Sequence, residues 1–107
     1  MSDRELLEAA AKAAGLEEFS YINGRYAVRT RHTGMQDWSP WNPLTDDGDA
    51  LRLAVALLLE IHIYHTGVSV RIPTGDKVVI EADQEPDPYA ATRRAIVRAA
   101  AAIGEKT

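Results

Sequence analysis

The sequence contains no cysteine. Disulfide bonds and zinc sites with thiolate ligands are therefore excluded, and cysteine usage does not indicate a redox compartment. No apolar run approaches the roughly 20 residues that cross a bilayer. Basic residues are not in excess either, since the formal net charge is −4 and the pI is near 5.3. This balance argues against a protein whose main task is to bind a nucleic-acid backbone.

Signatures of common enzyme classes are also missing. The chain has no P-loop, no G-x-G-x-x-G fingerprint and no nucleophile elbow. Of its three histidines, His32 stands alone, while His62 and His65 are three residues apart on a predicted strand and point to opposite faces. We therefore expect no metal site, no cofactor and no catalysis.

A length of 107 residues with 46% hydrophobic residues is typical of one domain, 1–107, with a small core. The first 15 residues are charged and amphipathic, and they lack the basic-then-apolar pattern of a signal peptide. We expect a soluble cytoplasmic protein.

Periodicity and turn signals predict the element order α-β-β-α-β-β-β-α. The two-residue turns Asn23-Gly24 and Thr66-Gly67 mark hairpins, so the sheet is mainly antiparallel. The predicted class is α/β of the α+β type, with helices packed on the sheet. The helices are expected at 3–14, 46–58 and 88–103, and the strands at 19–22, 25–30, 60–65, 68–72 and 77–81.

The segment 46–58 is predicted to be the central, largely buried helix. Its acidic start supplies capping oxygens and suits the helix dipole, which explains Asp46, Asp47 and Asp49 better than a cation site does. Apolar residues then occupy more than one row of the helix, namely Leu51, Leu53, Ala54, Val55, Leu57 and Leu58.

The last predicted helix begins at Asp87-Pro88, and Gly104 is expected to end it. It has a nearly flat alanine side formed by Ala91, Ala95, Ala99 and Ala102. Packing within the chain explains this side better than a homodimer does.

Two long segments, WNPLTDDGDALRLAVALL at 41–58 and DPYAATRRAIVRAAAAIG at 87–104, resemble the small bacteriophage proteins of the phage ABA sandwich domain family. The opening DRELLEAAAKAAG at 3–15 is similar too. The resemblance implies a three-layer sandwich with the sheet between helices. It also implies a phage accessory protein in the cytoplasm of an infected bacterium, and it brings no catalytic residues.

Two groups of residues are candidates for binding. Trp38, Met35 and Trp41 lie in one irregular loop, where we expect Trp41 to join the core and Trp38 with Met35 to form a protein interface. A second group would hold a small anionic ligand on the polar sheet face: His62, Tyr64 and Arg71, with Arg93 or Arg94.

These features favour a non-catalytic phage protein that binds and modulates a host bacterial protein, with host defence as one target class. One alternative is a protein that sequesters a small anionic, nucleotide-like ligand. Another is a phage structural or assembly component. We expect no direct contact with nucleic acid and none with a membrane.

Overall fold

The computed structural model describes residues 2–16, 18–29, 38–73, 78–81 and 87–105. These residues form three helices and two antiparallel sheets in the predicted order, with one additional short strand. The α/β fold class is therefore confirmed. The helices are α1 (Asp3–Ala13), α2 (Asp47–Ala56) and α3 (Pro88–Gly104). The strands are β1 (Glu18–Ile22), β2 (Arg25–Arg29), β3 (Ser39–Pro40), β4 (Glu60–Tyr64), β5 (Gly67–Arg71) and β6 (Val78–Glu81).

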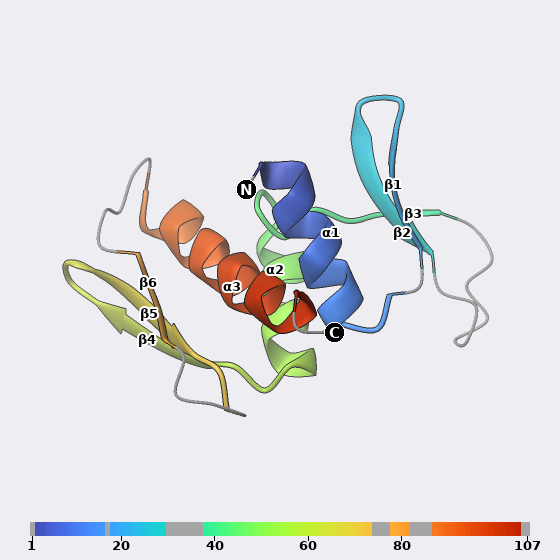
Figure 1. The fold of residues 1–107 in the computed structure, drawn as a ribbon. Coiled ribbons are helices and arrows are strands. Elements are labelled where there is room, and N and C mark those ends of the chain that lie inside the picture. The colour runs from blue at the N-terminus through green and yellow to red at the C-terminus, as the bar shows by residue number, and fades with distance from the viewer. Residues whose placement is uncertain (1, 17, 30–37, 74–77, 82–86, 106–107) are drawn as a thin grey trace.

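The helices lie between the two sheets (Figure 1). The first sheet has the strand order β1-β2-β3, and the second has the order β4-β5-β6. The expected sandwich placed one sheet between helices, whereas here the two hairpins remain separate and cover opposite sides of the helical layer. The reason is local, because a hairpin of two short strands pairs with itself, and nothing in its sequence requires it to join the other hairpin.

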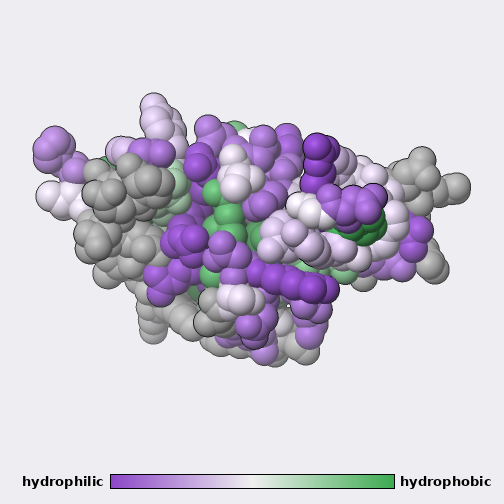
Figure 2. Space-filling model, turned by 90° about the horizontal axis from the view of Figure 1, so that it is seen from above, coloured by the Kyte–Doolittle hydropathy of each residue, from purple (hydrophilic) through white to green (hydrophobic). Residues whose placement is uncertain are grey.

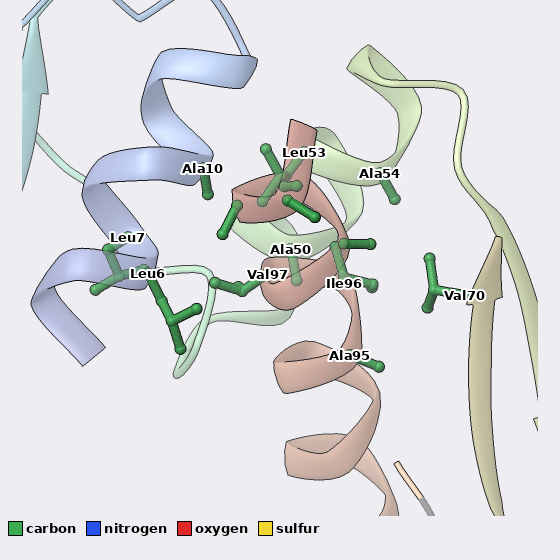
Figure 3. Close-up of a cluster of buried hydrophobic side chains, with 14 of the residues drawn as sticks. Leu6, Leu7, Ala10, Ala50, Leu53, Ala54, Val70, Ala95, Ile96 and Val97 are labelled. Atoms are coloured by element: carbon green, nitrogen blue, oxygen red, sulfur yellow. The ribbon is translucent and has the colours of Figure 1, made fainter. Parts of the chain in front are cut away.

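The helix at the centre of the fold is α3, and the prediction that the segment 46–58 takes this place is wrong. Helix α3 contacts α1, α2, β5 and β6, and Figure 3 shows it between Leu6 and Leu7 of α1 and Val70 of β5. Helix α2 packs only one side onto α3. Apolar residues on its other side are exposed, with Leu51 at 61% and Val55 at 65%, and Leu58, which follows the helix, is 73% exposed.

The alanine side of α3 packs inside the molecule, as expected. Ala91, Ala95, Ala99 and Ala102 are all buried. They lie on the side of α3 that faces the second sheet, where Figure 3 shows Ala95 on the side of Val70, and α3 contacts both β5 and β6. Gly104 was expected to follow the helix and terminate it. It is instead the last residue within α3, and Glu105 is the C-cap.

Predicted helix starts are confirmed by their hydrogen bonds. Ser2 and Glu5 form a reciprocal capping box, with both N–H···O distances at 3.2 Å. The Asp46 carboxylate accepts from the backbone N–H of Asp49, and Asp87 caps α3 with Pro88 at its first position. Helix α2 ends at Ala56 rather than at residue 58, because Leu58 takes a left-handed conformation with a φ of 55° that turns the chain toward β4.

Figure 2 shows that polar side chains cover most of the face seen there, with apolar residues in a narrow strip in its middle. The apolar core lies mainly around α3, and Leu7, Val70 and Val97 are among its most deeply buried side chains.

The capping box of α1 makes a testable contribution to stability at neutral pH. The backbone N–H of Ser2 and its side chain hydrogen-bond to Glu5 and lower the pKa of that carboxyl below its ordinary value of 4.5. A carboxyl with a lowered folded-state pKa stabilises the protein above its unfolded-state pKa, and this contribution is lost as the pH falls through the folded-state value. We therefore expect Glu5→Gln to lower the melting temperature at pH 7.

The same variant should lose its effect in acid, because protonated Glu5 and Gln have nearly the same shape and charge. Melting temperatures of the two proteins measured from pH 7 down to below 4.5 should converge. A constant difference over this range would contradict the role given to the Glu5 charge.

Candidate functional site

Trp38 is held in a row of side chains that crosses the first sheet. The register of β2 and β3 pairs Val28 with Ser39, which places Trp38 beside Arg29. The Arg29 guanidinium lies 4.8 Å from the centroid of the Trp38 ring, a cation–π contact. Arg29 is also opposite Glu18 of β1 and forms an ion pair with it. Arg29 is thus fixed between an acid and an aromatic ring.

An open cleft of about 840 Å³ lies between this row and helix α1. Successive turns of α1 contribute Glu5, Glu8 and Lys12 to the cleft. These residues share a face of the helix because they are three and four residues apart. The C-terminal end of α3 closes one side with Gly104 and Glu105. The remaining lining residues are Ala9, Ala11, Leu16, Glu18, Phe19, Ser20 and Trp38.

The cleft carries more negative than positive charge. Four glutamates line it, and Lys12 is the one lysine among its lining residues. Glu5 is ionised at neutral pH, since its hydrogen bonds with Ser2 lower its pKa. Acidic side chains around the aromatic ring of Trp38 provide ion pairing and cation–π contacts together. This combination suits the cationic side chain of a lysine or arginine.

The two tryptophans have different environments, and the predicted core position of Trp41 can be compared with the structure. Trp41 is 9% exposed and belongs to the core, where its ring meets Phe19 edge-on at 6.2 Å. Its placement in the core is confirmed. Trp38 is half-buried and lines the cleft, and its role as an interface stays a prediction. Met35, predicted to act with Trp38, lies outside the described residues.

The structure does not bring the predicted anion-binding residues together. His62 and Tyr64 stack at 6.5 Å on the exposed face of the second sheet, and Arg71 on the same face pairs with Glu60 at 3.7 Å. Val68 and Val70 are buried on the opposite face, which packs on α3.

The two arginines of α3 predicted to bind the anion, Arg93 and Arg94, are therefore on the other side of this sheet. Arg93 donates to the Leu44 carbonyl at 2.8 Å and to Asp47 at 2.6 Å, tying α3 to the start of α2. Arg94 faces Asp3 at 3.4 Å. Each arginine has an acidic partner within the chain, which sequence spacing could not show because the partners are 46 and 91 residues away.

The acids at the start of α2 have structural roles, as expected. Asp46 caps the helix, Asp47 holds Arg93, and Asp49 accepts hydrogen bonds from Asn42 and Arg52. No group of three His, Cys, Asp or Glu side chains suited to a metal occurs in the part of the chain that the structure describes. His62 and His65 are exposed, and His32 is outside that part.

The acidic wall of the cleft was missed by sequence reasoning. The spacing of Glu5, Glu8 and Lys12 indicates one polar face of the first helix, and such a face ordinarily meets only water. Its position opposite Trp38 depends on how α1 packs on α3 and on where the hairpin β1–β2 stands. Both are tertiary features without a local signal.

Protein-family models, curated protein sequences and solved structures were compared with the chain, and none of them matches it. The similarity to phage ABA sandwich proteins therefore stays a prediction. Among the described residues, no helix combines the length and the apolar character needed to cross a bilayer.

Proposed function

We propose that this chain is a small non-catalytic binding protein whose Trp38 cleft holds a basic segment of a partner protein. The observation that carries the proposal is the pairing of a half-buried tryptophan with an acid-lined cleft of about 840 Å³. Tryptophan is enriched at binding hot spots because it buries a large area with few torsions. The glutamates around it would attract and orient a positively charged partner.

The resemblance to phage proteins suggests what the partner is. A phage accessory protein acts in an infected bacterium, so the partner would be a host protein, and a defence protein is one such target. Host enzymes that act on nucleic acids have basic surfaces, which an acidic cleft complements. The sequestering of a nucleotide-like ligand is less well supported, since the arginines proposed for it are paired with acids.

Partner capture tests this proposal. Immobilised wild-type protein should retain a specific bacterial protein, while Trp38→Ala and the charge reversal Glu8→Lys should lose at least nine-tenths of it. A loss of tenfold corresponds to about 1.4 kcal/mol, well within the range for a hot-spot residue. Retention should also weaken as the salt concentration rises, because screening reduces attraction between charged surfaces.

Tyr89→Ala is the matched control, since Tyr89 is an exposed aromatic residue on α3 that does not line the cleft. This variant should retain the partner as the wild type does. Equal retention by Trp38→Ala and the wild type would refute the proposed site, provided that both variants give wild-type circular dichroism spectra.

A further inference from the structure

Strand β4 is an open edge of the second sheet. Among the strands that the structure describes, the order β4-β5-β6 leaves one side of β4 without a neighbour, and no backbone hydrogen bond from another described element reaches Ile61 or Ile63. Natural edge strands are commonly protected by lysine, proline or a bulge. The sequence EIHIY has none of these, and its pairing with β5 is regular over all five residues.

The free backbone groups of this edge can be assigned from the hairpin. Tyr64 and Gly67 flank a two-residue turn, so they form a hydrogen-bonded pair, and the pattern alternates along the ladder. His62 and Glu60 consequently also direct their N–H and C=O groups toward β5. Ile61 and Ile63 direct theirs to the open side, which gives two donors and two acceptors for an incoming strand.

Apolar side chains lie beside these groups. Ile63 is 69% exposed although it pairs with the buried Val68 and shares its face. An exposed apolar row, Leu51 and Val55 of α2 with Leu58 after the helix, precedes β4 in the chain. This row points away from the first sheet, because the opposite side of α2, with Leu53 and Ala56, lines a pocket against that sheet.

We propose that β4 pairs antiparallel with β4 of a second copy of this chain, with His62 at the two-fold axis. In this register Ile61 lies opposite Ile63 of the partner, so all four free groups of each strand are hydrogen-bonded. Glu60 lies opposite the partner's Tyr64, which keeps the two like charges apart. The edge is therefore complementary to itself, and the dimer would extend the sheet from three strands to six.

Cysteine cross-linking tests the register, and the natural chain offers a background without cysteine. At a non-hydrogen-bonded antiparallel pair the two Cα atoms are about 4.5 Å apart, within the range of a disulfide. His62→Cys should therefore become a covalent dimer under mild oxidation. Glu60→Cys should not, because the two copies of position 60 would be about 13 Å apart along the strands.

Sedimentation tests the dimer itself. The wild type should have twice the mass of the 11.7-kDa chain, and Ile63→Pro should be monomeric, since proline removes a donor on the open side without breaking the β5 ladder. Tyr21→Pro is the matched control, because Tyr21 takes the same place in the edge strand β1, one residue before the closing pair Ile22–Arg25. It should remain dimeric.

Any one of several results would overturn the proposal. They are a monomeric wild type throughout the micromolar range, an Ile63→Pro variant as dimeric as Tyr21→Pro, and cross-linking of Glu60→Cys equal to that of His62→Cys. If Ile63→Pro does not fold, as judged by circular dichroism, the two cysteine variants decide the question. A strand of an unrelated protein that binds β4 of a monomeric chain would also refute the homodimer.

Discussion

Replacing Gly104 by alanine should destabilise the protein by about 3 kcal/mol, because an added methyl group in this close helix contact cannot be accommodated by side-chain movement alone. A Cβ atom at this position would lie 1.9 Å from the carbonyl oxygen of Ala9 and 2.8 Å from its carbonyl carbon. Both atoms belong to the backbone of α1, so the two helices would have to separate. The separation would loosen the contact between α1 and α3, where Leu7 and Val97 lie (Figure 3). Urea unfolding should show a lower midpoint with an unchanged slope.

Gly48→Ala is the matched control, since Gly48 is also a helical glycine. A Cβ atom there would lie 3.2 Å from the ends of the Arg52 and Asp46 side chains, which can move. Alanine also has the higher helix propensity. We expect the stability of this variant to stay within about 1 kcal/mol of the wild type. If both alanine variants had the same midpoint, the close approach of α1 and α3 would not be a main determinant of stability.

Gly104 also shows where sequence reasoning reaches its limit. A glycine at the end of an apolar helical run has the pattern of a C-cap, and the two helices that precede it in the sequence are followed by left-handed residues, Gly15 and Leu58. At Gly104 the same pattern has another cause, namely the nearby backbone of Ala9. Local conformation and tertiary contact both select glycine, and one sequence does not distinguish them.

The elements themselves were predictable because their signals are local. Capping residues, the Asn-Gly turn and strand alternation act over a few residues, and they placed the predicted boundaries within one residue except at the end of α2. The layer order and the central helix depend on which apolar faces meet. The apolar rows of α2 and α3 look equally suited to burial, yet the alanines of α3 allow closer packing on two sides.

The candidate site was predictable only in part for the same reason. The loop with two tryptophans indicated both a core residue and a surface residue, and Trp41 took the core position. The glutamates that make the cleft acidic come from α1, from β1 and from the residue that follows α3. Residues from such distant segments are brought together by tertiary packing. No spacing in the sequence therefore predicts this acidic cluster.

Replacing Trp41 by alanine should cost about 3–5 kcal/mol, the usual range for removing a buried large aromatic side chain. Its ring lies between the first sheet and α2, where it meets Phe19 edge-on and lines the same pocket as Leu53. A marginally stable domain of this size would retain little or none of its stability. Thermal unfolding should show a much lower midpoint, or the variant should lack a cooperative transition altogether.

Trp38→Ala is the informative comparison, because the two residues are three positions apart and the change in volume is the same. Trp38 is half-buried, and its contact with Arg29 is worth about 0.5–1 kcal/mol in an exposed setting. This variant should therefore melt close to the wild type while it loses the partner. Opposite effects of the two substitutions would separate folding from recognition within one loop. If Trp38→Ala unfolded as readily as Trp41→Ala, Trp38 would be part of the core, and the cleft would lose its proposed binding residue.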